Sequence, residues 1–341
     1  MGTSHGKGGL GRIVALSWSV DTLITDDPAE AALILQRGGL VAFPTETVYG
    51  LGGDATRTDV IADIFRAKGR PSDNPLIVHI SSVEDLWQVC AKVPESALRL
   101  LDAFAPGPMT VVIPRAGRVA PEVSAGLDTV AVRIPSHPLA LALIEAAGLP
   151  VAAPSANRSG RPSATTWTAV RDDLGGSIDA ILTGERSEVG IESTVVDCTV
   201  DPPAVLRAGG VSLEELRRVC PTLVGQGERL SASPGTRHPH YAPHASVEIV
   251  EGPRHAAGAA YIGFETGHRA GAEGTAAVES DGEYALVCLV KDTREYAHHL
   301  YNFFRECDAA GVRTIHCQRA PEDGLGRALS DRITRAAAAS S

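Results

Sequence analysis

Short apolar runs alternate with amphipathic stretches along most of the chain. Eight runs between residues 25 and 220 have the length and residue types of β-strands. These predicted strands are residues 40–43, 76–80, 110–113, 129–134, 150–153, 180–183, 193–197 and 204–207. Runs that are apolar throughout are typical of strands covered on both faces. The pattern therefore predicts an α/β domain built on a mixed, largely buried sheet.

Three stretches between these strands have helical spacing. Residues 28–38, 58–69 and 137–148 each end in glycine, which commonly ends a helix because it adopts a left-handed conformation without strain. The sequence SLEE at 212–215 matches a capping box and predicts the start of another helix.

Residues 220–245 break the alternation. They have no sustained periodicity and are rich in glycine, proline and serine, which is typical of a linker or a functional lid. Beyond them, residues 246–250, 259–264, 284–290 and 313–317 predict strands, and residues 294–311 predict an amphipathic helix. The chain thus divides into a flexible glycine-rich segment (1–20), an α/β domain (21–219), a linker or lid (220–245) and a smaller, Rossmann-like α/β domain of roughly doubly wound type (246–341).

Composition narrows the classes of function. The 341 residues carry a formal net charge of −10, which makes the chain a poor candidate for wrapping a nucleic-acid backbone. None of its six cysteines forms a C-x-x-C pair, so a zinc finger is not expected. No apolar run is long enough for a transmembrane helix or a secretory signal. We expect a soluble, cytoplasmic protein with no membrane partner.

The stretch KGRPSDNPLIVHI combines cations with a rigid turn. Lys68 and Arg70 flank a glycine at the end of a predicted helix, and the following proline stops that helix. With Ser72 they offer a point charge, a guanidinium fork and a hydroxyl, a set that suits a polyphosphate. Lys68 alone has a simpler explanation, since a cation stabilises a helix C-terminus. His79 alone fits a core histidine bonded to the backbone.

The predicted strand TVAVRIP contains an arginine. Thr129, Ala131 and Arg133 share one face of that strand. A buried arginine is costly unless it is paired, and no acidic residue is adjacent on the strand. Its partner is therefore either a remote Asp or Glu, or an anionic group on a ligand, and the sequence leaves both open.

Several loops that follow predicted strands are rich in hydroxyl groups. FPTETVYGLG contains Thr45, APSANRSGRPSATT contains Ser155, Asn157 and Ser163, and GIESTVVD contains Ser193. Loops at strand ends are where α/β proteins bind ligands, although turns favour the same residues for conformational reasons. Many hydroxyls with few carboxylates suit an anionic ligand.

The usual nucleophilic and metal-dependent motifs are missing from the sequence. Neither G-x-S-x-G nor H-E-x-x-H occurs, and Cys90 in a predicted helix and Cys198 at a strand end are more typical of structural positions. His238, His240 and His244 have spacing that fits a metal, but prolines separate them and no rigid frame surrounds them. We therefore predict no metal site made by side chains.

Taken together, these segments resemble one family. FPTETVYGLG, KGRPSDNPLIVHI, VAVRIP, APSANRSGRPS, GIESTVVD and LRAGG are similar, in this order, to the segments typical of the YrdC-like domain, a twisted mixed sheet with flanking helices. The linker sequence SPGTRHPHYAP and the terminal GLGRALSDRITRAA resemble those of the two-domain threonylcarbamoyl-AMP synthases.

The resemblance implies an activity. Such enzymes condense L-threonine, bicarbonate and ATP into threonylcarbamoyl-AMP, releasing pyrophosphate, with Mg²⁺ expected to accompany ATP. A downstream tRNA threonylcarbamoyl transferase machinery then uses this product, while direct tRNA contact by the synthase is left open. No protein nucleophile is needed, because positioning and charge neutralisation dominate such transfers.

The resemblance also assigns residues. Lys68 and Arg70 are the expected catalytic residues, holding the triphosphate, with Asn157 as a further phosphate contact. The expected ATP-binding residues are Lys68, Ser72, Thr129, Ala153, Ser155, Asn157, Ser163, Arg207 and Tyr241. The expected threonine-binding residues are Thr45, His79, Arg133 and Ser193.

Three alternatives stand beside this assignment. A carbamoyltransferase-associated YrdC-like protein would carry zinc-finger cysteines in a longer chain, and this chain has neither. A double-stranded RNA-binding module would need a basic concave face. A structural protein that only retains the fold would leave the buried Arg133 unpaired.

Overall fold

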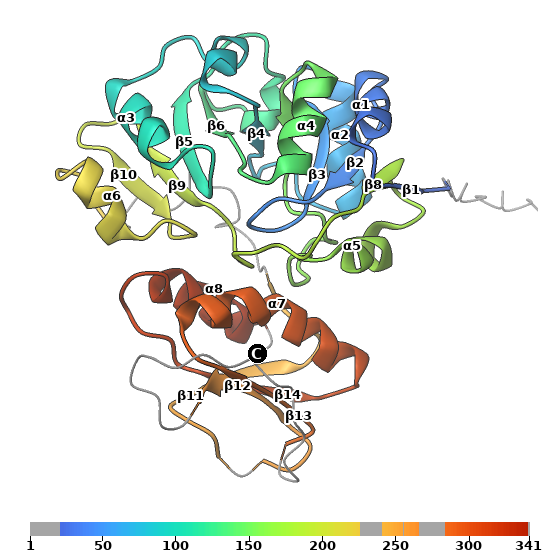
Figure 1. Ribbon diagram of the computed structural model, residues 1–341, viewed down its shortest axis with the longest axis vertical. Coiled ribbons are helices and arrows are strands. Elements are labelled where there is room, and N and C mark those ends of the chain that lie inside the picture. The colour runs from blue at the N-terminus through green and yellow to red at the C-terminus, as the bar shows by residue number, and fades with distance from the viewer. Residues whose placement is uncertain (1–20, 226–240, 255, 266–283, 340–341) are drawn as a thin grey trace, which may run out of the picture.

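The computed structural model describes residues 21–225, 241–254, 256–265 and 284–339. These residues form two α/β domains, each with its own sheet (Figure 1). The segment 1–20 and most of the expected lid, including His238 and His240, lie outside the described residues.

A ten-stranded mixed sheet forms the first domain. Its strands, in spatial order, are β1 (Leu23–Thr25), β8 (Ala180–Leu182), β2 (Val41–Phe43), β3 (Gly50–Asp54), β7 (Val151–Ala152), β4 (Ile77–His79), β6 (Thr129–Arg133), β5 (Met109–Pro114), β9 (Thr194–Asp197) and β10 (Ala204–Arg207). All eight predicted strands are confirmed, and their side chains are almost entirely buried. Pairings of both directions occur, for example β4 parallel to β6 and antiparallel to β7.

Helices cover this sheet. They are α1 (Pro28–Gln36), α2 (Thr58–Lys68), α3 (Glu95–Phe104), α4 (Pro138–Ala147), α5 (Trp167–Leu174), α6 (Leu213–Val219) and the 3₁₀ turns η1 (Val83–Gln88) and η2 (Pro121–Ser124). The three predicted helices are confirmed, and α2 and α4 end at Gly69 and Gly148 with φ of 62° and 66°. The capping box at Ser212 is formed and starts α6.

The sequence pattern failed at β3. FPTETVYGLG was predicted to enter a turn, yet Gly50–Asp54 is a central strand. Its glycines are needed for packing: a Cβ on Gly52 would lie 2.7 Å from Val151 Cγ1 and 2.8 Å from Phe43 Cε1. Glycine in a strand interior commonly marks such a close approach. Cys90 also differs from its prediction, since it follows η1 in an isolated bridge rather than a helix.

The second domain has a four-stranded parallel sheet. Its strands, in spatial order, are β11 (Ser246–Val250), β14 (Thr314–Gln318), β12 (Ala260–Phe264) and β13 (Leu286–Val290). The helices α7 (Thr293–Ala309) and α8 (Gly326–Ala339) lie between this sheet and the first domain (Figure 1). The parallel sheet agrees with a Rossmann-like domain, but these two described helices share one face instead of covering both, as a doubly wound sheet would require.

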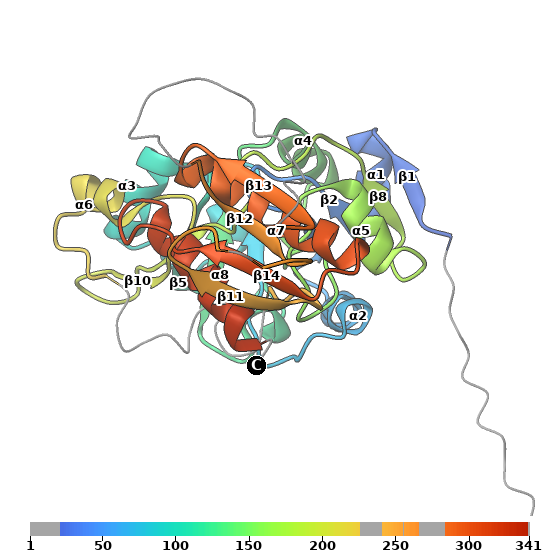
Figure 2. The same cartoon turned by 90° about the horizontal axis from the view of Figure 1, so that it is seen from below.

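The two domains pack against each other over the middle of the first one (Figure 2). Val48 and Ile191 of the first domain belong to the same apolar cluster as the core of the second domain. Four ion pairs among the described residues also cross the interface: Arg161 with Asp308, Arg305 with Asp173, Arg327 with Glu214 and Arg332 with Glu192. Within the described part of the chain, no helix is both long and apolar enough to cross a bilayer.

Candidate active site

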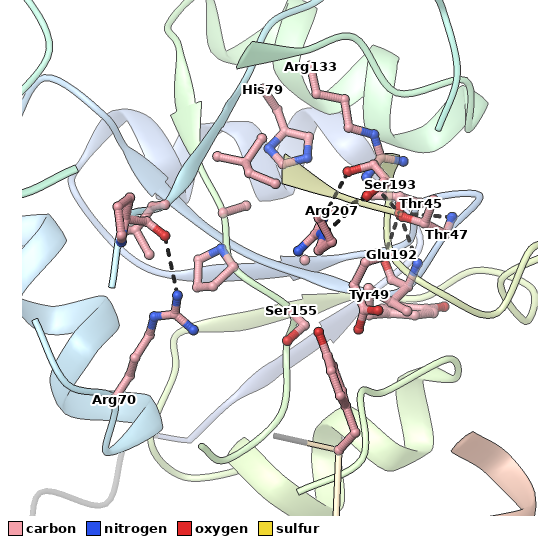
Figure 3. A pocket seen from close by; sticks show the side chains of 18 residues that line it. Thr45, Thr47, Tyr49, Arg70, His79, Arg133, Ser155, Glu192, Ser193 and Arg207 are labelled. Carbon is pink, nitrogen blue, oxygen red and sulfur yellow. Dashed lines mark hydrogen bonds between the residues drawn. The ribbon is translucent and has the colours of Figure 1, made fainter. Parts of the chain in front are cut away.

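A cavity of about 70 Å³ lies in the first domain where the ends of its strands meet the second domain. Loops after β2, β7 and α2 and the start of β9 contribute to its wall (Figure 3). The lining residues are Thr45, Thr47, Val48, Tyr49, Gly50, Arg70, Pro75, Leu76, Ile77, His79, Arg133, Ala153, Pro154, Ser155, Glu192, Ser193, Arg207 and Tyr241.

The four residues predicted to bind threonine all line this cavity. His79 and Arg133 end the neighbouring strands β4 and β6 and are paired in register, so both side chains are brought to the same place. Thr45 and Ser193 come from the loops after β2 and before β9. The sequence thus predicted this group as a spatial cluster, although its members are spread over much of the first domain.

Arg133 has an acidic partner that the sequence did not reveal. Its Nη2 donates to Glu46 Oε1 at 2.6 Å, its Nη1 to Thr47 Oγ1 at 2.9 Å and its Nε to the Gly107 carbonyl at 3.3 Å. Of the two partners that the sequence left open, the remote acidic residue is present, because Glu46 arrives from a distant loop. An N–H on each terminal nitrogen remains for a ligand.

His79 is a neutral imidazole. Burial and the nearby Arg133 lower its pKa to about 3, so it carries no charge at neutral pH. Its Nδ1 is buried and has no hydrogen-bond partner among the described residues. Orphaned buried polar atoms are rare, and this one lies on a wall of the cavity.

Ser193 connects the site to β5 and β10. Its hydroxyl lies 2.8 Å from Thr110 Oγ1 and accepts from Arg207 Nη2 at 3.2 Å. Arg207 also donates from Nε and Nη2 to the Ser193 carbonyl, at 3.1 Å and 3.0 Å. These contacts fix a hydroxyl and a guanidinium side by side in the cavity (Figure 3).

Arg70 brings a further cation to the opposite side of the cavity from Thr45 and Glu192 in Figure 3. Its Nη2 donates weakly to the carbonyls of Asn74 and Pro75, at 3.4 Å and 3.3 Å. Its Nε is buried and has no partner among the described residues. Burial lowers the Arg70 pKa to about 10, which leaves the guanidinium charged at neutral pH.

Lys68 does not line the cavity but lies directly behind its wall. Its ammonium donates to the Ser155 carbonyl at 2.6 Å and also to the Asn157 carbonyl, holding the loop after β7. Burial and the adjacent Arg70 lower the Lys68 pKa well below its ordinary value. These carbonyls use two of the three N–H donors of the ammonium, and Lys68 is not part of the cavity lining, so its predicted catalytic role stays a prediction.

The other residues predicted to bind ATP either line the cavity, lie one contact away from it, or lie outside it. Ala153, Ser155, Arg207 and Tyr241 line the cavity. Asn157 and Ser163 stand one contact away, since Asn157 Oδ1 accepts from Ser155 Oγ at 2.5 Å and Ser163 donates to Glu192 at 2.7 Å.

Ser72 and Thr129 are outside this lining. Ser72 is exposed, and Thr129 lies at the far end of β6, about 13 Å along the strand from Arg133. Their predicted contacts with ATP remain predictions.

Two glutamates of the site were missed from the sequence. Glu46 lies behind Arg133, and its Oε2 also accepts from the Ser136 N–H at 3.1 Å. Glu192 lines the cavity directly. Glu46 belongs to FPTETVYGLG and Glu192 to GIESTVVD, two motifs that were noted for their hydroxyl groups. A carboxylate next to these hydroxyls was the sequence feature that could have identified them.

The cavity lining does not form a magnesium site by itself. Mg²⁺ prefers carboxylate oxygens together with phosphates and water. The lining carboxylate is Glu192, and both of its oxygens already accept hydrogen bonds, from Ser163, Tyr301 and Arg332. Among the described residues there is also no group of three or more His, Cys, Asp or Glu that could hold a metal. All six cysteines are free and buried.

The fold and the site define a two-domain α/β protein of the YrdC type with a cation-lined internal pocket. The family model described as "Telomere recombination" matches residues 33–209, and the one described as "Threonylcarbamoyl-AMP synthase, C-terminal domain" matches residues 211–338.

Similar proteins carry the same name. The Threonylcarbamoyl-AMP synthase of Pyrococcus abyssi is 42% identical over 317 residues, covering 90% of this chain and 92% of that protein. The Threonylcarbamoyl-AMP synthase of Bacillus subtilis is 42% identical over 341 residues, covering 94% of this chain and 97% of that protein. The chain belongs to the threonylcarbamoyl-AMP synthase family, whose members are adenylate-forming enzymes.

A solved structure extends the likeness to three dimensions. The crystal structure of P. abyssi Sua5 complexed with L-threonine superposes with a TM-score of 0.82 at 37% identity, covering 94% of this chain and 98% of that chain. The similarity therefore includes both domains.

Proposed function

We propose that this chain is a cytoplasmic enzyme that condenses L-threonine, bicarbonate and ATP into L-threonylcarbamoyl-AMP and releases pyrophosphate. The observation that carries the proposal is the meeting of Thr45, His79, Arg133 and Ser193 in one buried cavity with the cations of Arg70 and Arg207. The family membership and the threonine complex of the P. abyssi protein support it.

The proposed chemistry has two steps. The threonine amine attacks the carbon of bicarbonate, a C–N bond forms, and water leaves after proton transfer. A carbamate oxygen then attacks the α-phosphorus of ATP, and the bond from that phosphorus to the pyrophosphate oxygen breaks. Neither step needs a protein nucleophile, so positioning and charge neutralisation are the roles left for the side chains.

Threonine recognition falls to one wall of the cavity. The free N–H groups of Arg133 suit the threonine carboxylate, because a guanidinium fork and a carboxylate match in geometry. The neutral His79 offers one hydrogen bond without adding charge, and the hydroxyls of Thr45 and Ser193 offer others.

ATP recognition falls to Arg207, which contacts Ser193, and to Arg70 on the other side of the cavity. Arg70 has a buried Nε without a partner among the described residues, which an anion would satisfy. Mg²⁺ is proposed to arrive with the triphosphate, held by phosphate and water oxygens. The product would serve a separate transferase that modifies tRNA, in keeping with the family name.

The test is product formation. The purified chain is incubated with ATP and Mg²⁺, with and without L-threonine and bicarbonate, and both pyrophosphate and the adenylate are measured. We expect pyrophosphate release to depend on threonine and on bicarbonate. Equal ATP breakdown with and without threonine would refute the assignment.

A further inference from the structure

Glu192 lines the cavity, and its carboxylate makes its hydrogen bonds to groups outside that lining. Its Oε1 accepts from Ser163 Oγ at 2.7 Å. The Tyr301 hydroxyl lies 3.2 Å from Oε1 and 3.1 Å from Oε2. Its Oε2 also accepts from Arg332 Nε at 2.8 Å. Tyr301 and Arg332 belong to α7 and α8, so the second domain supplies two of the three groups that hold this carboxylate.

Arg332 is fully buried and spans both segments that carry site residues. One contact is the ion pair with Glu192, the residue before Ser193. Another is the donation from its Nη2 to the Ala208 carbonyl, 3.0 Å away, next to Arg207. Its guanidinium carbon also lies 5.4 Å from the ring centre of Tyr241, which stacks on Tyr301. Arg332 thus contacts Glu192 and Ala208. These are the sequence neighbours of Ser193 and Arg207, which Figure 3 shows side by side.

The charge of Glu192 matters because of where it lies. Burial acts to raise the pKa of Glu192, but Arg332, Arg207 and the Ser163 hydrogen bond outweigh it and keep the carboxylate ionised. An ionised carboxylate on the wall of a cavity for anions repels them, since Coulomb interactions are strong where water is excluded. Arg332 places a compensating positive charge directly behind it.

We propose that Arg332 is a positioning residue of the active site, delivered by the second domain: it neutralises Glu192 and turns that carboxylate away from the ligands held by Ser193 and Arg207. The second domain then has a defined task in this chain, which is to set the charge of the cavity wall. The proposal also gives a function to the terminal motif GLGRALSDRITRAA, which contains Arg332. This inference rests on the proposed function for the identity of the anionic ligands.

The test measures ligand binding separately from product formation. Calorimetry gives the affinity of Mg²⁺-ATP and of L-threonine for the wild type, R332M, R332K, E192Q and the double variant E192Q/R332M. We expect at least a tenfold loss of ATP affinity in R332M, a smaller loss in R332K, and recovery to within about threefold of E192Q in the double variant. A double-mutant cycle of this kind isolates the coupling between the two residues.

R305M is the matched control. Arg305 is a half-buried cation of the second domain, and its Nη2 pairs with the buried Asp173 at 2.8 Å, but Asp173 does not line the cavity. Small-angle scattering checks that the domains stay docked in each variant. Because E192Q/R332M removes both members of the Glu192–Arg332 pair and Asp331 keeps its pair with Arg335, it keeps the comparison valid even if R332M folds poorly.

Each outcome decides the question. Unchanged affinity in R332M overturns the proposal, and so does an equal loss in R305M. A loss in R332M that E192Q does not recover shows that Arg332 acts without Glu192, which also overturns it. If the wild type binds ATP but forms no adenylate, the proposed function fails while the charge inference is still tested by the binding data.

Discussion

Two buried arginine–glutamate pairs flank the cavity, and they point in opposite directions. In the first, Arg133 faces the cavity and Glu46 lies behind it. In the second, Glu192 lines the cavity and Arg332 lies behind it. The first pair lies within one domain, whereas the second joins the two domains.

The difference separates two uses of the same chemical pair. A buried ion pair contributes little net stability, because desolvation of both ions offsets their attraction. The presence of such a pair is better explained by the charged group that it presents to, or withholds from, a ligand. The first pair presents an oriented guanidinium to a ligand, while the second hides a negative charge from it. Removing the rear partner should therefore loosen a binding group in the first pair and introduce a repulsion in the second.

The largest effect is expected for Arg133→Met. The change leaves Glu46 buried without its cationic partner, which costs roughly 3–5 kcal/mol of unfolding free energy. Threonine-dependent pyrophosphate release should fall more than about a hundredfold, because the charge-assisted contact to the carboxylate is lost. Urea denaturation and initial rates measure the two effects. The double change Glu46→Gln with Arg133→Met should recover stability without activity, and full activity in either variant would contradict the role of Arg133.

A smaller effect is expected for Glu46→Gln. Arg133 keeps its donations to Thr47 and Gly107, so its position is partly preserved. We expect the threonine KM to rise about three- to tenfold, which is less than the roughly 1.5–3 kcal/mol of a lost hydrogen bond to a charged group, because a glutamine side-chain oxygen can still accept from Arg133. The KM for ATP should not change. Arg133→Lys, which keeps charge without the fork, should shift the same parameter further. A change in the KM for ATP alone would contradict the assignment of Glu46 to threonine binding.

The third effect is a dependence of stability on pH. The pKa of His79 is lowered to about 3 in the folded protein, against an ordinary value of 6.5, chiefly through burial. A group with a lowered pKa contributes stability above its unfolded pKa, and this stability is lost as the pH falls through 6.5 toward 3. Between pH 7 and pH 5 this loss amounts to about 2 kcal/mol.

The check on His79 is the difference between two chains. Unfolding free energies of the wild type and His79→Gln are measured at both pH values, because the carboxylates contribute equally in each. The wild type should lose about 2 kcal/mol more than the variant on acidification. Equal losses of unfolding free energy in the two chains would show that His79 titrates normally and that water reaches the cavity wall on which it lies.

Local sequence patterns predicted the elements well and the site in part. The strands and helices read from periodicity are present except for the helix expected at Cys90, because burial on both faces makes a strand apolar throughout and a final glycine ends a helix. β3 was missed because its glycines serve close packing. The four residues that the resemblance assigned to threonine line one cavity.

Partners across long distances could not be predicted in the same way. Glu46 meets Arg133 only because β2 and β6 belong to one sheet, and that strand order is not written in any local pattern. Glu192 meets Arg332 across a domain interface, where the two residues are 140 positions apart. Lys68 was assigned to phosphate from its charge, and its burial against two carbonyls became visible only in three dimensions.

The smallest effect is expected for Arg327→Met, and it sharpens the comparison. Arg327 lies on α8 like Arg332 and also pairs across the domains, its Nη1 being 2.6 Å from Glu214 Oε1. The two side chains are 37% and 45% exposed, however, and neither lines the cavity. Exposed pairs contribute only about 0.2–1 kcal/mol, because water and salt screen them. The free energy of unfolding, measured by thermal denaturation, should fall by no more than this amount. The affinities for ATP and threonine should stay within about twofold of the wild type. A large loss of ATP affinity in this variant would mean that any weakening of the interface impairs the site. The contrast between the buried and the exposed arginine of one helix therefore tests whether charge at the cavity wall, rather than docking alone, is what the second domain contributes.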